Sequence, residues 1–202
     1  MKLRNAEKRL LIAVSQIIEN EGFSKIGVNK IAKQAKCDKV LIYRYFGGLE
    51  GLLAAWAKDN DFYTLAYQAY SERMTKAESS EDIIKLTQTV LLKQLNFLRT
   101  NKLMQELLAW ELSGNSTFRS IQDERERNGF KLQEELEKKL GKESKDVRMF
   151  ITILIASINY IVLATRQYRI FNGIDFSNPE AWELCKQTIY KYIRALFENI
   201  LK

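Results

Sequence analysis

The segment 28–46 reads VNKIAKQAKCDKVLIYRYF and has the pattern of two short helices joined by a tight turn. Its first half places apolar residues at positions 28, 31, 32 and 35, which is the spacing of one face of an amphipathic helix. Asp38 then offers a carboxylate suited to cap a second helix over residues 39–46. Because only residues 36–38 separate the two helices, they must cross steeply, as in a helix-turn-helix.

The second of these helices would expose donor side chains at Lys39, Tyr43, Arg44 and Tyr45. Their N–H and O–H groups suit phosphate oxygens and base edges, so the segment predicts a DNA-binding unit. The alternative is a pair of core helices with solvated lysines. That alternative would require the spacing, the cap and the charge to coincide by chance.

Basic residues are concentrated near the N-terminus. The 202-residue chain has a net charge of +7, and residues 1–47 hold ten Lys and Arg against four Asp and Glu. The rest of the chain holds 22 Lys and Arg against 21 Asp and Glu. A basic N-terminal quarter on a nearly neutral body indicates that nucleic acid binds at one end.

The chain has no histidine and two distant cysteines, Cys37 and Cys185. Ser-His-Asp and Cys-His nucleophiles, His-containing zinc sites and C-x-x-C motifs are thereby excluded. We therefore expect no metal, no cofactor and no enzymatic activity, although an all-α enzyme is the rival class. Two lone thiols suit a reducing cytoplasm, and the N-terminus lacks the apolar core of a secretory signal.

Beyond residue 47 the sequence predicts a helical body. One proline and nine glycines favour long helices over many short strands. The apolar spacing predicts helices over about 5–21, 49–74, 81–100, 101–112, 117–140, 146–171 and 179–201. We expect an all-α fold, with a three-helix DNA-binding domain at residues 1–47 and a larger effector-binding and dimerisation domain at residues 48–202.

The last two predicted helices, 146–171 and 179–201, carry more apolar surface than one body is expected to bury. Residues 149–164 read MFITILIASINYIVLA, apolar almost all round but short of the roughly 18–20 residues of a membrane span. We therefore predict that both helices pack against a second copy of the chain, and we predict no membrane partner. Ile193 and Leu196 would lie either in that interface or in the core.

Three short motifs resemble the signature of the DNA-binding domain of TetR/AcrR-type transcriptional regulators. They are Gly22-Phe23, Ile31-Ala32 and Tyr43-Arg44-Tyr45-Phe46. The chain departs from that signature at Lys36, where the family has a tight-turn glycine, and at Val40, where it has a small residue. The resemblance implies a homodimer whose last two long helices form a four-helix bundle with their mates.

The resemblance also implies which side chains meet double-stranded DNA. Lys39 and Arg44 suit guanine O6 or N7 in the major groove, and Leu41 suits a thymine methyl group. Tyr45 would lie on a phosphate, and two residues of the preceding helix would reach a phosphate or a base edge. The candidate DNA-binding residues are Asn29, Lys30, Lys39, Leu41, Tyr43, Arg44 and Tyr45.

A second set of side chains suits a small-molecule effector. Aromatic rings and one amide recur in the predicted body, where they are suited to line an apolar cavity. For each of them, ordinary packing in the core is the alternative. The candidate ligand-binding residues are Trp56, Phe62, Tyr63, Tyr67, Trp110, Asn159 and Tyr160.

Together these expectations describe a ligand-responsive transcriptional regulator. We predict a repressor that a small apolar effector releases from a pseudo-palindromic operator. A second interpretation stays open: a helix-turn-helix regulator controlled by a protein partner, or acting as an activator, without a small-molecule ligand.

Overall fold

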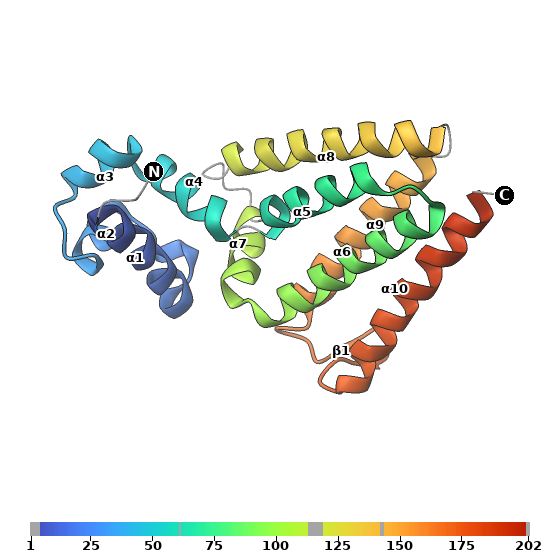
Figure 1. Cartoon of the computed structure of the whole chain (residues 1–202). Helices are drawn as coiled ribbons and strands as arrows, with labels where there is room; N and C mark the ends of the chain where they lie inside the picture. Colours follow the sequence, from blue (N-terminus) through green and yellow to red (C-terminus); the bar gives the residue numbers. More distant parts are fainter. Residues whose placement is uncertain (1–4, 61, 113–118, 142–143, 201–202) are drawn as a thin grey trace. The chain divides into compact units, whose positions relative to one another are not determined.

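The computed structural model describes residues 5–60, 62–112, 119–141 and 144–200, and these residues are almost entirely helical (Figure 1). The predicted all-α class is confirmed. In chain order the elements are α1 (Asn5–Glu21), η1 (Phe23–Lys25), α2 (Val28–Gln34), α3 (Val40–Phe46), α4 (Leu49–Asn60), α5 (Phe62–Lys76), α6 (Ser80–Thr100), α7 (Lys102–Leu112), α8 (Arg119–Leu140), α9 (Ser144–Ala164), β1 (Ile170–Phe171), β2 (Ile174–Asp175) and α10 (Pro179–Ile200).

The chain forms two compact units, and each of them combines two separate segments of the sequence. The first unit combines Met1–Leu65 with Asn101–Glu126, and the second combines Ala66–Thr100 with Arg127–Lys202. Helix α7 therefore belongs to the same unit as α1–α4, and it packs against α1 and η1. The predicted functional boundary at residue 47 stays a prediction, since these units are defined by packing alone.

The first unit is built around α1, whose buried stripe includes Leu10, Val14 and Ile17. Helices α2, α3 and α4 all pack against α1, and α3 also packs against α4. Ile31 of α2 and Ile42 of α3 are fully buried, as the spacing of the segment 28–46 requires. Burying these side chains fixes the angle at which α3 crosses its neighbours.

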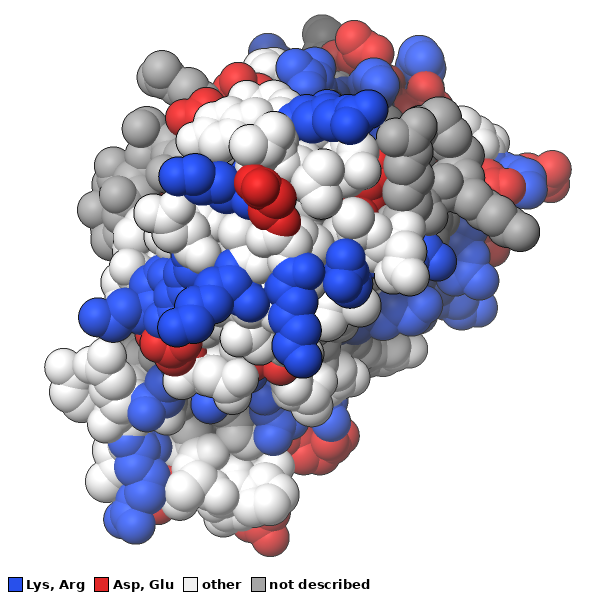
Figure 2. Space-filling view, turned by 90° about the vertical axis from the view of Figure 1, so that its left-hand side faces the viewer, with Lys and Arg blue, Asp and Glu red and all other residues white. Residues whose placement is uncertain are grey.

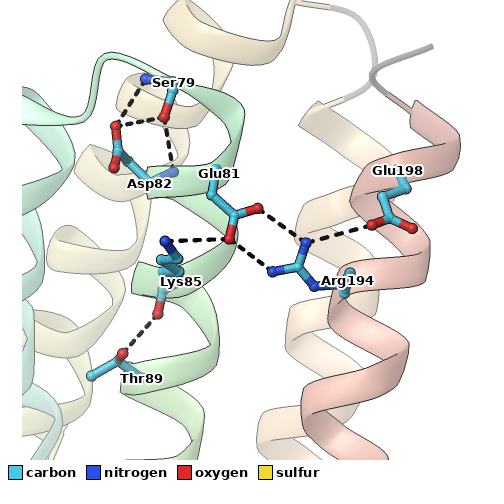
Figure 3. Close-up of polar contacts among 7 residues, drawn as sticks. All are labelled: Ser79, Glu81, Asp82, Lys85, Thr89, Arg194 and Glu198. Atoms are coloured by element: carbon cyan, nitrogen blue, oxygen red, sulfur yellow. Dashed lines mark hydrogen bonds and ion pairs between the residues drawn. The ribbon is translucent and has the colours of Figure 1, made fainter.

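The second unit is held by α6, which packs against both α9 and α10. At the start of α6, the backbone N–H of Asp82 donates to the Ser79 hydroxyl, and the Asp82 carboxylate accepts bonds from Ser79 in return. This reciprocal arrangement is a capping box, which satisfies backbone N–H groups at the start of the helix. In the same turn, the Arg194 guanidinium of α10 binds the Glu81 carboxylate through both oxygens, at 2.8 and 3.0 Å (Figure 3).

Helix α9 leaves most of its apolar surface exposed within one chain. Of the 18 residues in its most apolar window, 17% are buried. The helix begins at Ser144, five residues before the apolar run, so by length and composition it is long enough to cross a membrane. The apolar run itself still covers residues 149–164, and the prediction of no membrane partner stays a prediction.

Residues 49–74 were expected to form one helix. Helices α4 and α5 lie on either side of residue 61, which is outside the described residues, so this expectation stays a prediction. One sequence prediction differs from the structure: the helix expected over 146–171 ends at Ala164, and an antiparallel hairpin of β1 and β2 follows. Its turn is Asn172-Gly173, with φ of 50° and 77°. Both residues adopt the left-handed conformation that two-residue hairpin turns require.

Candidate DNA interface

Helix α3 presents a row of exposed side chains on its outward face. Lys39, Val40, Tyr43 and Arg44 are exposed, and Tyr43 retains 56% of its accessible surface. On the opposite side Ile42 is completely buried. The helix therefore rests on the first unit through Ile42 and offers an ammonium, a phenol and a guanidinium to a partner.

Local contacts hold α3 in place at both ends. The Asp38 carboxylate accepts a hydrogen bond from the Val40 backbone N–H at 2.8 Å, which confirms the predicted cap. At the other end Gly47 adopts φ of 75° and donates its N–H to the Tyr43 carbonyl at 2.9 Å. Such a left-handed glycine is a common helix terminator, since it has no Cβ to crowd the carbonyl.

The turn between α2 and α3 carries an unusual residue. Lys36 has φ of 52°, the left-handed conformation that a glycine adopts without cost and a lysine does not. Its N–H donates to the Lys33 carbonyl, and the Cys37 N–H donates to the Ala32 carbonyl, so the turn is closed by backbone bonds. These bonds hold Lys36 in its strained conformation and leave its side chain exposed.

Helix α2 differs from the prediction in how its polar residues are used. Asn29 is exposed, whereas the Lys30 ammonium forms an ion pair with the Glu21 carboxylate of α1. Nearby, the Gln34 side-chain amide donates to the Gln16 amide oxygen of α1 at 2.7 Å. These two contacts brace α2 against α1, so Lys30 has a structural role whether or not it also meets DNA.

Two predicted contact residues are less exposed than the rest. Leu41 and Tyr45 are half-buried, and the Tyr45 ring meets the Phe46 ring edge-on at 6.5 Å. Figure 2 views the molecule from the end where α1–α3 are drawn, and shows more Lys and Arg than Asp and Glu on this face. The exposed basic residues of the first unit include Lys25, Lys33, Lys36, Lys39, Arg44 and Lys58.

Residues 11–56 match the family model described as bacterial regulatory proteins of the tetR family. The matched range runs from α1 to Trp56 of α4, and so covers the complete helix-turn-helix. Over these residues the predicted resemblance to the TetR family is confirmed, and the regulators of that family are non-enzymatic DNA-binding proteins.

Solved structures show that the TetR-like fold extends over the whole chain. A TetR-like transcriptional regulator from Rhodococcus sp. RHA1 is 16% identical with a TM-score of 0.57, over 100% of this chain and 98% of that one. A TetR-family regulator from Streptomyces coelicolor is 20% identical with a TM-score of 0.56, over 96% and 99%. The fatty acid degradation regulator FadR from Bacillus halodurans is 19% identical with a TM-score of 0.56, over 96% and 97%. None of the curated protein sequences matches the chain.

The aromatic residues predicted for an effector site fall into both units. In the first unit, the Phe23 ring lies between Trp56, edge-on at 5.7 Å, and Trp110, stacked at 6.1 Å. Phe62 is buried and meets the Tyr63 ring edge-on at 5.8 Å. The Arg125 guanidinium lies 4.9 Å from the centre of the Tyr63 ring. Phe23 of η1 thus contacts an aromatic ring of α4 and one of α7.

The remaining effector candidates lie in the second unit. Tyr67 is half-buried on α5. The Asn159 amide oxygen accepts a bond from the Gln94 side-chain amide at 2.9 Å, which joins α9 to α6. Tyr160 is 59% exposed and meets the Phe171 ring of β1 edge-on at 5.5 Å. Tyr160 therefore lies on the surface of the single chain. A second chain could contact it there more readily than a ligand enclosed in a cavity.

Val40 is a surface residue of α3 that was not among the predicted DNA contacts. Val40 keeps 59% of its accessible surface, more than Leu41, which had been assigned the apolar contact. Its exposure could have been predicted from helical spacing, because Val40 lies three residues before Tyr43 and four before Arg44 and so shares their face.

Proposed function

We propose that this TetR-family regulator is a cytoplasmic homodimer that binds a pseudo-palindromic operator as a repressor and releases it when a small molecule binds. The observation that carries the proposal is the exposed donor face of α3, which each chain supplies once. One short helix reads only a few base pairs, so specific binding benefits from two copies on two half-sites.

The dimer is supported by the exposed apolar side chains of α9 and α10. Met149, Ile153 and Tyr160 recur at spacings of four and seven residues on α9, and each keeps more than half of its accessible surface. On α10, Leu184 and Tyr192 are similarly exposed. A soluble protein rarely leaves such a stripe open to water, and an isologous contact with a second copy would cover it on both chains.

Regulation by an effector is supported by the position of α7. This helix packs against α1 and η1, and its Trp110 stacks on Phe23 at the edge of the helix-turn-helix core. Tyr63 and Trp110 are only half-buried, so a ligand can reach their rings more readily than the fully enclosed Trp56. A ligand that binds beside α7 and prefers one arrangement of it would shift the DNA-binding helices. Coupling of this kind typically amounts to about 1–3 kcal/mol.

The proposal is tested by selecting bound fragments from genomic DNA and footprinting the purified protein on them. We expect a protected site with two inverted half-sites about 34 Å apart, the spacing of adjacent major grooves on one face of DNA. Candidate effectors would then be drawn from the substrates of neighbouring genes and assayed for release of the operator. Binding that shows no sequence preference would contradict the operator, and an operator without any releasing compound would favour control by a protein partner.

Two substitutions separate the roles proposed within α3. Tyr45→Phe should weaken binding similarly on every sequence, since a phosphate contact carries no sequence information. Lys39→Ala should relax the preference at one position of each half-site, since a base edge is then no longer read. Equal loss of preference from both variants would contradict this assignment of roles.

A further inference from the structure

Val40 is an apolar residue on the exposed face of α3, whose other side chains are mainly hydrogen-bond donors. A single exposed valine needs no explanation by itself, since isolated apolar residues are common on protein surfaces. Its neighbours make this one informative. Lys39, Tyr43 and Arg44 surround it on α3, and Val40 keeps 59% of its accessible surface between them. Any partner that those donors bind will also cover Val40.

The position of Val40 on α3 is fixed by local structure. Its backbone N–H is held by the Asp38 carboxylate at 2.8 Å, so the first turn of the helix is anchored at this residue. Branching at Cβ leaves valine one strongly preferred rotamer in a helix. The two methyl groups therefore project from α3 in a defined direction, and little side-chain entropy is lost when a partner covers them.

DNA offers one apolar group to such a side chain in its major groove. This group is the C5-methyl of thymine, while the other base edges there present hydrogen-bond donors and acceptors. Burying the valine against any other edge would remove water from polar atoms without replacing their bonds. Leu41, one residue later, is half-buried within the chain itself and is therefore less available to a base.

We propose that Val40 packs against a thymine methyl group and sets a preference for T·A at one base pair of each half-site. The donors Lys39 and Arg44 would read neighbouring base pairs in the same groove. This inference rests on the operator proposed above. It assigns the apolar base contact to Val40 in place of Leu41.

The test uses uracil in place of thymine in the operator recovered by selection. Each dT is replaced in turn by dU, which removes only the methyl group and keeps the base pair. We expect one dU position per half-site at which wild-type affinity falls by about fourfold, the loss of one buried methyl-sized group. Val40→Ala should bind the all-thymine operator more weakly and should be insensitive to dU at that position alone. Val40 is exposed, so the variant should melt as the wild type does.

Two matched variants sharpen the outcome. Lys39→Ala should weaken binding but keep the wild-type dependence on the methyl group, because the lysine is beside the contact and not part of it. Leu41→Ala should also keep that dependence. If Leu41→Ala loses the dependence and Val40→Ala keeps it, or if the dU profiles of wild type and Val40→Ala are the same, the assignment to Val40 is overturned. Failure to recover any preferred site overturns the operator itself, which is a distinct result.

Discussion

The indole N–H of Trp56 donates to the Ser15 hydroxyl at 2.8 Å, and this bond joins α4 to α1 across 41 residues of sequence. Trp56 is 1% exposed, and its ring packs edge-on against Phe23. Trp56 thus closes the core of the DNA-binding unit, on which the orientation of α3 depends. Replacing it with alanine would open a large cavity at a cost of about 3–5 kcal/mol, so such a variant reports folding before it reports ligand binding.

We predict that Ser15→Ala lowers the free energy of unfolding by about 1–3 kcal/mol, because it leaves a buried indole N–H without a partner. Urea titration followed by circular dichroism measures the change. Ser24→Ala, at an exposed position of η1, is the control and should change little. In a Trp56→Phe background, Ser15→Ala should lower the free energy of unfolding by less, because phenylalanine has no indole N–H to donate. An equal cost in both backgrounds would show that the bond is not what Ser15 contributes.

We predict that Lys36→Gly stabilises the protein by about 1 kcal/mol, because a glycine adopts φ of 52° without the clash that a Cβ introduces. Lys36→Ala is the matched control, since it removes the same charge but keeps the Cβ. The glycine variant should therefore melt above the alanine variant. Both should bind DNA with a smaller salt dependence than wild type if the ammonium lies near a phosphate. Equal melting of the two variants would show that the turn relaxes around either residue.

Predictions from the sequence succeeded where the cause was local. The Asp38 cap and the buried Ile31 each depend on a few neighbouring residues, and both are present in the structure. The Asn172-Gly173 hairpin was equally local, and it was missed because its strands contain only two residues each. The hydrogen bond from Trp56 to Ser15 was not predicted, because Ser15 lies in another helix, which no spacing rule indicates.

Which face of an apolar helix packs against its own chain was harder to predict from the sequence. When both sides of α10 carry apolar residues, periodicity does not say which side meets the chain's own core. Ile193 is 1% exposed and lies in the core of the second unit, whereas Tyr192 beside it is exposed. Leu196 is half-buried. Substituting Ile193 with glutamate would therefore unfold the protein, and the interface has to be tested at other positions.

We predict that Glu81→Gln reduces the acid sensitivity of the second unit. The Arg194 guanidinium, through its hydrogen bonds and its charge, holds the pKa of Glu81 below its ordinary value of 4.5. A lowered pKa stabilises the fold fully above that ordinary value, and the contribution disappears as the pH falls through the lowered one. The difference in urea midpoint between wild type and Glu81→Gln should therefore be largest near neutral pH and vanish in acid. A difference that is independent of pH would contradict this origin.

We predict the opposite pH dependence for Tyr70. Burial raises the pKa of its phenol to about 12, against a smaller opposing effect of the Thr87 hydroxyl 3.3 Å away. Because the folded state holds this proton more tightly, stability should fall as the pH rises from about 10 to about 12. Tyr70→Phe should remove that part of the loss of stability at alkaline pH. At neutral pH the variant lacks the hydrogen bond to Thr87 and should be less stable than wild type. Titration of the urea midpoint of both proteins at alkaline pH measures the difference. Parallel curves would exclude Tyr70 as the group responsible.

The dimer provides the last prediction. Ile153 and Tyr160 are exposed on α9 and separated by seven residues, so they lie on one stripe of the helix. Ile153→Glu combined with Tyr160→Glu should leave the monomer folded, since neither side chain belongs to its core. In an isologous dimer each substitution occurs twice, and four buried carboxylates would then have to be desolvated. The protein should sediment as a monomer and bind the operator far more weakly.

The control for this experiment is Asn96→Glu on an exposed position of α6. It adds one carboxylate per chain outside the proposed interface, where the double variant adds two inside it, and it should leave both the sedimentation and the operator affinity unchanged. Circular dichroism and thermal melting of each variant establish that the chain is folded. A folded double variant that still sediments as a dimer would remove the α9 stripe from the interface. The exposed apolar surface of that helix would then require a different partner, and the membrane is the one that its length and composition permit.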